Sequence, residues 1–181
     1  MTERSNTFIQ RLIGAVSLDA AIYEEVEADR GATVQALVVV VLSSVAAGVG
    51  GRGLGGPSPA NVVFLTVVTL LAWAAWALLT FQIGGRLMPE PQTRVDVGEL
   101  LRTIGFSSAP GLLRVFGVLP GVTIPVFAIT SVWMLAAMVV AVRQALDYTS
   151  TGRAIAVCVI GWVIAIAFAV VIGLLFGPTV Y

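Results

Sequence analysis

The stretch TIGFSSAPGLLRVFGVLPGV, residues 103–122, decides the fold of this chain. It is apolar enough to enter a membrane, yet it contains Pro110 in its middle, Arg114 shortly after, and Pro120 followed by Gly121 at its end. A proline inside a helix removes a backbone hydrogen bond and crowds the preceding turn, so a kink is expected here. The stretch is therefore either a broken membrane span or a segment that does not cross, and the topology of the chain depends on which.

The composition indicates that the solvent of this chain is lipid. Of its 181 residues, 58% are hydrophobic and 11% are charged, and the mean hydropathy is +0.99. Soluble domains carry about 25% charged residues. Long uncharged runs lie on both sides of the opening stretch, and several reach the roughly 20 residues that a membrane-spanning helix needs. We therefore expect an all-α, polytopic membrane protein.

Two topologies compete, and the arginines discriminate between them because positive residues concentrate in cytoplasmic loops. If the stretch crosses, the chain has five spans, with the N-terminus in the cytoplasm and the C-terminus outside. Arg52 then lies outside, Arg114 lies in the outer part of the third span, and all other arginines lie inside. If the stretch does not cross, Arg143 and Arg153 join Arg52 on the outside. The first distribution fits the rule better, so five spans are favoured.

We accordingly predict a multi-pass protein of the plasma membrane with five transmembrane helices, the third of them kinked. An interfacial amphipathic segment, residues 1–33, precedes the membrane domain, residues 34–181. The predicted spans are residues 34–50, 60–83, 100–119, 124–142 and 154–176.

The N-terminal segment has the pattern of two short amphipathic helices. Phe8, Leu12 and Val16 are among the apolar residues that share one face of the first. Asp19 can cap the second, whose other side is acidic. That acidic side disfavours contact with anionic headgroups and so points to the cytosol. Two interpretations stay open: the helices lie in the membrane interface, or residues 1–30 form a platform that binds a protein partner.

The break in the third span defines a candidate groove, formed by Ser107, Ser108, Pro110 and Arg114. The two serines are within reach of the turn that Pro110 interrupts. A charge near the bilayer centre costs roughly 3 kcal/mol on insertion scales, and less nearer the interface. Arg114 therefore either extends outward to the interface or faces a polar interior, where it lines a groove for a solute or a lipid headgroup.

The fifth predicted span carries a small residue at every fourth position. Such a stripe lets two helices approach closely in lipid. It packs either against another span of the same chain or against a second copy in a homo-oligomer. The stripe consists of Gly161, Ala165, Ala169, Gly173 and Gly177.

Several kinds of chemistry lack the residues they need. The chain has no histidine and no lysine, and Cys158 is its single cysteine, so we expect no catalytic residues, no metal site and no cofactor. The formal net charge is zero, which gives no field to attract nucleic acid. No acidic residue falls within a predicted span, whereas coupled transporters commonly place carboxylates there.

Three stretches carry a family resemblance: FIQRLIGAVSLDAAIYEEVEADRGATVQAL, GELLRTIGFSSAPGLLRVFGVLPGV and VRQALDYTSTGRAIAVCVIGW. In these the chain resembles the Yip family of Ypt/Rab-interacting membrane proteins, in its bacterial branch. The resemblance implies a cytosolic N-terminal segment, five spans and a non-enzymatic role in partner binding or membrane organisation. Eukaryotic members are linked to vesicle trafficking and prenylated small GTPases. Their Asp-Leu-Tyr-Gly-Pro motif is matched here only by Asp19 and Tyr23, so GTPase binding is not implied.

The residues themselves leave a second function open. A broken span with one arginine is also typical of a small channel, carrier or lipid-handling protein that uses a groove around the break. In that case the partner is a solute or a component of the lipid bilayer.

Overall fold

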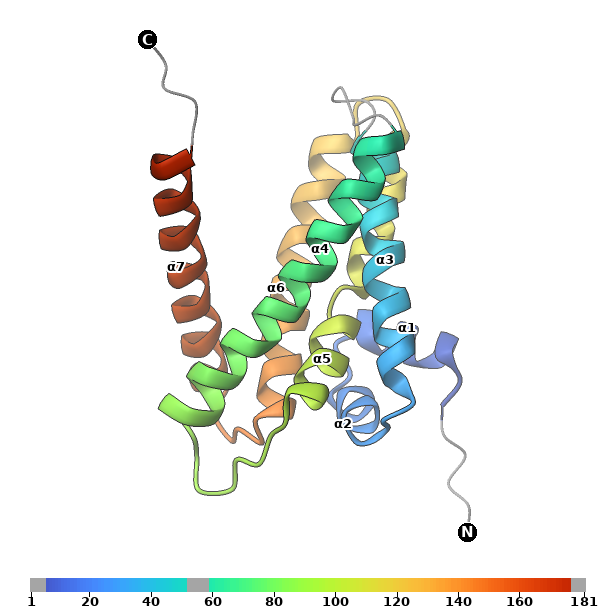
Figure 1. Cartoon of the computed structure of the whole chain (residues 1–181). Coiled ribbons are helices and arrows are strands. Elements are labelled where there is room, and N and C mark those ends of the chain that lie inside the picture. Colours follow the sequence, from blue (N-terminus) through green and yellow to red (C-terminus); the bar gives the residue numbers. More distant parts are fainter. Residues whose placement is uncertain (1–5, 52–58, 177–181) are drawn as a thin grey trace.

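The computed structural model describes residues 6–51 and 59–176, with the backbone alone over 59–65 and 169–176. Over these residues the chain is all-helical, and Figure 1 shows the long helices side by side, with the short N-terminal helices at one end. The helices are α1 (Phe8–Val16), α2 (Ala20–Ala28), α3 (Ala32–Gly50), α4 (Pro59–Thr80), η2 (Phe81–Leu87), α5 (Val97–Phe106), η3 (Ala109–Val118), α6 (Thr123–Ala145) and α7 (Thr151–Phe176).

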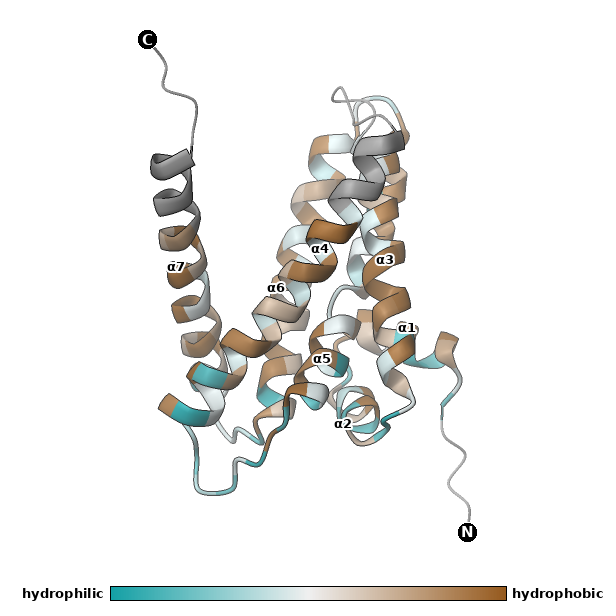
Figure 2. Cartoon of the chain, viewed as in Figure 1, coloured by the Kyte–Doolittle hydropathy of each residue, from teal (hydrophilic) through white to brown (hydrophobic). Residues whose placement is uncertain are grey.

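Four helical segments among the described residues are long and apolar enough to cross a membrane. They are Ala32–Gly50, Thr66–Leu87, Thr123–Ala145 and Thr151–Phe168. Figure 2 shows that apolar residues cover these helices, whereas hydrophilic residues gather at one end of the bundle. The prediction of an all-α integral membrane protein with several spans is confirmed. The predicted third span is not among the four, because it is divided between α5 and η3, each of 10 residues.

The second span does not end at residue 83 as predicted. It continues through Gly84 and Gly85 to Leu87 as a π-helix, η2, which has a wider turn than an α-helix. A Cβ at Gly84 would collide with the side chain of Leu146, the residue after α6. Gly84 is therefore a close-packing position inside a helix rather than a helix terminator.

The third segment is broken, but Pro110 does not kink a continuous helix. Asp96 caps α5 in a reciprocal capping box: its side chain accepts from Glu99 N at 2.8 Å, and the Glu99 carboxylate accepts from Asp96 N at 2.7 Å. At the other end of α5, the Ser107 hydroxyl donates to the Ile104 carbonyl at 2.7 Å. A new 3₁₀-helix, η3, then begins with Pro110 in its first turn. At that position a missing N–H removes no helical hydrogen bond, so the proline starts a helix.

The segment formed by α5 and η3 runs parallel to α3 along most of its length. Three glycines face three small residues in matching order: Gly105 faces Ala36, Gly111 faces Ser43 and Gly117 faces Gly50. A Cβ at Gly105 would lie 2.7 Å from the Ala36 Cβ, and one at Gly117 would lie 3.1 Å from the Gly50 carbonyl oxygen. We call this contact the glycine seam. Along this seam, the segment formed by α5 and η3 extends from near the start of α3 to its end.

The N-terminal helices share a core with the long helices. Tyr23 and Val26 of α2 are fully buried in one cluster with Ala36 of α3 and Phe106 of α5. The Tyr23 hydroxyl donates to the Ala15 carbonyl at 3.2 Å and so ties α2 to α1. The packing is therefore continuous across residue 33, the predicted boundary between the N-terminal segment and the membrane domain.

Candidate functional site

Arg114 lies on η3 and points toward α6. Its Nη2 donates to the Ser131 hydroxyl at 2.9 Å, and its Nε donates to the Thr130 hydroxyl at 3.3 Å. The guanidinium carbon stands 5.3 Å from the centre of the Phe127 ring. Thr130 is the eighth residue of α6, so the side chain sits about 10 Å inside the end at which α6 begins.

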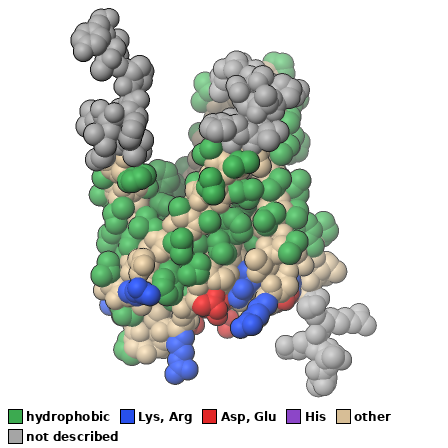
Figure 3. All heavy atoms as spheres, viewed as in Figure 1, with side chains coloured by type: hydrophobic (Ala, Val, Ile, Leu, Met, Phe, Trp, Pro, Cys, Tyr) green, Lys and Arg blue, Asp and Glu red, His purple; other side chains and the backbone are tan. Residues whose placement is uncertain are grey.

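The charge of Arg114 is isolated within the part of the chain that the structure describes. Every other described charged residue belongs to α1, α2, η2 or α5, to the end of α6 or the start of α7, or to the loops that adjoin these segments. We call this the charged end, and Figure 3 shows blue and red side chains gathered there on the visible face. Among the described residues Arg114 pairs with no carboxylate; its polar partners are hydroxyls.

Arg114 lines a cavity of about 370 Å³ between α3, α4, η3, α6 and α7. Ser107 and Ser108 line the same cavity, so the structure brings three of the four predicted groove residues together. The fourth, Pro110, is buried and is not on the wall. Most of the remaining wall is apolar. That these residues form a binding site remains a prediction, and the geometry shows only that they surround one hollow.

Trp76 of α4 also lines this cavity. The indole nitrogen of Trp76 is buried and has no hydrogen-bond partner among the described residues. Its ring packs edge-on against Trp162 of α7, with the ring centres 6.3 Å apart. Sequence reasoning missed Trp76, because an indole in a membrane span usually serves as packing or as an interface anchor.

The predicted small-residue stripe on α7 is seen in contact at one position. Gly161 lies under Trp76, and a Cβ there would stand 3.1 Å from the Trp76 ring. Ala165 is exposed. Ala169 and Gly173 lie where the backbone alone is described, and Gly177 lies outside the described residues. The homo-oligomer interpretation of the stripe therefore stays a prediction.

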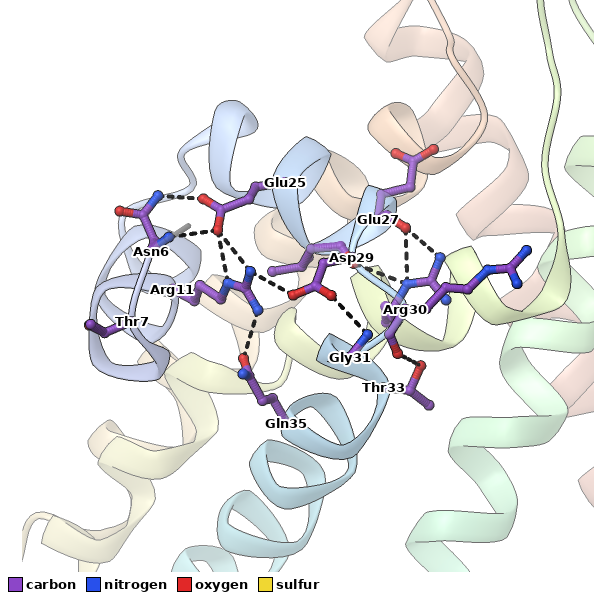
Figure 4. A network of polar contacts seen from close by, with 12 residues as sticks. Asn6, Thr7, Arg11, Glu25, Glu27, Asp29, Arg30, Gly31, Thr33 and Gln35 are labelled. Atoms are coloured by element: carbon purple, nitrogen blue, oxygen red, sulfur yellow. Dashed lines mark hydrogen bonds and ion pairs between the residues drawn. The ribbon is translucent and has the colours of Figure 1, made fainter. Parts of the chain in front are cut away.

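Two buried arginines hold the N-terminal helices in place, as Figure 4 shows for the first of them. Arg11 of α1 donates through Nε and Nη2 to Glu25 at 3.0 and 2.8 Å, and through Nη1 to Gln35 at 3.0 Å. Its Nη2 also lies 2.8 Å from Asp29. The side chain is 2% exposed, so α1, α2 and α3 meet at one buried cation. Burial works against it, but hydrogen bonds from Asn6 and Arg11 hold the pKa of Glu25 below its ordinary value.

Arg102 of α5 performs the same task at the end of α2. Its Nε donates to the carbonyls of Val26 and Glu27, both at 3.0 Å, and its Nη2 donates to the Glu27 carbonyl. These carbonyls belong to the last turn of α2, which has no helical partners for them and carries partial negative charge. Counting arginines for topology treats Arg11 and Arg102 alike and cannot show these contacts.

A larger cavity, of about 540 Å³, opens at the charged end. Its wall includes Glu27 of α2, Glu99 of α5, and Arg143 and Asp147 at the end of α6. Burial, with the nearby charges of Asp147, Glu99 and Glu24, raises the pKa of Glu27 to about 7. Because both signs of charge line this cavity and no described group marks a ligand, it does not define a binding site by itself.

The fold and the cavities define a polytopic helical membrane protein, with no group of His, Cys, Asp and Glu among its described residues that could hold a metal ion. A family model, the Yip1 domain, matches residues 19–172, and the chain therefore belongs to the Yip1 domain family. The predicted family resemblance is thus confirmed, whereas its bacterial branch stays a prediction. No curated protein and no solved structure matches the chain.

Proposed function

We propose that this Yip1-domain protein is non-enzymatic, crosses the membrane five times, and binds an anionic lipid headgroup at Arg114. The observation that carries the proposal is a cation on the wall of a mainly apolar cavity, with hydroxyls rather than a carboxylate as partners. Yip1-domain proteins are generally non-enzymatic, which agrees with the first part.

The glycine seam supports the five-crossing topology. It keeps α5 and η3 beside α3 from Ala36 to Gly50, which covers most of a helix long enough to span. The arginine distribution supports an orientation with the charged end in the cytoplasm and the end of α7 outside. We propose the plasma membrane as the location.

The chemistry of arginine supports an anionic ligand. A guanidinium presents five N–H donors in a planar fork that matches phosphate or carboxylate oxygens in pairs. The two hydroxyls at Arg114 leave donors over. A cation inside the membrane without a counter-charge is costly, so an anion beside it offsets part of that cost.

The exposed face of α1 supports the interfacial interpretation of the N-terminal segment. Ile9 and Ile13 are 61% and 60% exposed. Phe8 of α1 packs against Phe106, the neighbour of Gly105, at the level of Ala36. That level is about 6 Å along α3, which is the depth at which interfacial helices bury their apolar face. Binding of a protein partner by residues 1–30 remains a second proposal, for which Glu24, the exposed carboxylate of α2, is available.

The headgroup proposal is tested by intact-complex mass spectrometry of the full chain in mild detergent, with phosphatidylglycerol and phosphatidylcholine as probes. Arg114→Gln should lower retention of phosphatidylglycerol about tenfold, because a hydrogen bond to a charged group is worth about 1.5–3 kcal/mol. Arg86→Gln is the matched control, since Arg86 also stacks on a phenylalanine ring, at 5.1 Å, but lies at the charged end. Equal retention of the two lipids by the wild type would refute the proposal.

A channel or carrier that uses the same cavity is the alternative. Solute flux in proteoliposomes that Arg114→Gln reduces and Arg86→Gln does not would favour it over lipid binding alone.

A further inference from the structure

We infer that the Arg114 cavity and a groove between α6 and α7 form one site for a whole ester-linked anionic lipid, with its headgroup at Arg114 and an acyl chain in the groove. This inference rests on the proposed headgroup site and adds the tail, the linkage and the orientation of the ligand.

The two hollows adjoin one another and share part of their walls. The groove has a volume of about 360 Å³ and is lined by residues of α6 and α7. Leu135, Met138 and Trp162 line both the groove and the Arg114 cavity. A ligand that enters at Arg114 therefore reaches the groove past the Trp162 ring.

The groove is apolar and lies where α7 leaves the bundle. Near its start α7 is packed, with Ala154 and Val157 buried in one cluster with Val142 and Leu146. One or two turns further, the groove residues Val159 and Val163 are 54% and 61% exposed. Figure 3 shows the visible face hollowed between α7 and the other helices. The chemistry of these walls suits a hydrocarbon chain.

The order of the two parts matches the orientation of a lipid in a bilayer. Thr130, which holds Arg114, precedes Met138 of the groove by eight residues of α6, or about 12 Å. The polar part therefore lies nearer the end at which α6 begins, and the apolar part lies nearer the middle of the bundle. A lipid in the leaflet at that end also points its headgroup outward and its acyl chain inward.

The Trp76 side chain is a second observation, independent of Arg114, that indicates a ligand at this site. Its buried N–H lacks a partner among the described residues, although a buried donor without a hydrogen bond is costly. Trp76 lines the Arg114 cavity and packs edge-on against Trp162, which lines both hollows, so the Trp76 side chain stands beside the place where the two hollows meet. The group of a lipid that lies between head and tail is the ester, whose carbonyl oxygen accepts a hydrogen bond. The structure thus favours an ester-linked lipid over a simple alkyl anion.

The tail is tested with two variants at adjacent positions of α7, measured with long-chain phosphatidylglycerol. Val163→Trp fills the groove, whereas Ile164→Trp adds the same bulk at an exposed position outside it. We expect retention of the lipid to fall several-fold in the first variant and to stay unchanged in the second, with equal thermal stability. Soluble glycerol 3-phosphate should not compete, because the site holds a lipid-borne phosphate.

The linkage is tested with Trp76→Phe, which keeps an aromatic ring and removes the N–H. Wild type should prefer ester-linked over ether-linked phosphatidylglycerol, and the variant should lose that preference.

If Arg114→Gln abolishes headgroup preference but Val163→Trp behaves as Ile164→Trp, the headgroup site stands and the tail inference falls. If wild type shows no headgroup preference, the proposed function fails first. A wild-type dimer that Val163→Trp dissociates would show that a second copy fills the groove and would overturn the inference.

Discussion

Arg102 of α5 donates through Nε to the carbonyl oxygen of Val26 at 3.0 Å, across 76 residues of sequence. The contact joins the end of a helix outside the predicted spans to the broken segment inside the bundle. Arg102 is 5% exposed, so its charge is balanced by backbone dipoles and by nearby carboxylates such as Glu27 rather than by water.

We expect Arg102→Met to destabilise the protein by about 2 kcal/mol or more, because it leaves two buried carbonyls of α2 without their charged donor. Thermal unfolding in detergent measures the change. Arg94→Met is the control, since Arg94 is exposed in the loop before α5. Equal melting temperatures for the two variants would show that Arg102 does not hold α2.

The glycine seam predicts a strict size limit at Gly105. A Cβ there would lie 2.7 Å from the Ala36 Cβ and 3.2 Å from the Ala36 Cα, which belongs to the backbone and cannot move aside. Gly105→Ala should therefore cost about 1–3 kcal/mol of stability despite the better helix propensity of alanine. At Gly152, where a Cβ meets only an ordinary contact at 3.5 Å, the same substitution should be neutral or stabilising. A stabilised Gly105→Ala variant would disprove close packing at the seam.

The raised pKa of Glu27 predicts that the stability of the protein depends on pH. Burial and its acidic neighbours raise its pKa from 4.5 to about 7, against the opposing charge of Arg102, and Arg143 lines the same cavity. The folded state therefore binds this proton more tightly than the unfolded chain does. Stability from this group is complete below pH 4.5, falls as the pH rises to about 7, and changes no further above.

The Glu27→Gln variant should not show this loss of stability with rising pH, and it should melt at a higher temperature than wild type above pH 7. Glu24→Gln, an exposed change on the same helix, should keep most of the decline. Melting curves of the three proteins across this pH range decide the matter, and parallel curves for wild type and Glu27→Gln would contradict the assignment.

The proposed topology predicts opposite sides for two loops. Leu119 follows η3 and is 52% exposed, and Gln92 lies in the exposed loop between η2 and α5. In a Cys158→Ala background, an impermeant maleimide should label Leu119→Cys on intact cells and Gln92→Cys only after permeabilisation. Labelling of both positions from one side would mean that α5 and η3 do not cross.

The sequence predicts those parts of the fold that local physics determines. Hydropathy located the four long helices, the Asp19 side chain caps α2 as expected, and the proline in the third segment marked its break. Ser107, Ser108 and Arg114 were placed together because a break, two hydroxyls and a charge in one short stretch are a local pattern.

The rest depends on contacts between distant segments. Packing between distant segments decides which carbonyl accepts from Arg102. It also decides that the Trp76 nitrogen lacks a hydrogen-bond partner among the described residues. The glycine seam has a signal, a glycine at every sixth position from Gly105 to Gly117. From Gly111 to Gly117 that spacing is two turns of the 3₁₀-helix η3, and it is recognisable only once the helix type is known.

The halves of the third segment also bear on the order in which the protein assembles. Each is too short to be retained as a span during synthesis, and each carries an arginine. If the segment crosses, it enters the bilayer by docking onto a helix that is already there, and α3 is synthesised before it. Hydropathy would then determine only which long helices insert first. The final topology of this protein would be set afterwards, when the broken segment packs against α3 inside the membrane.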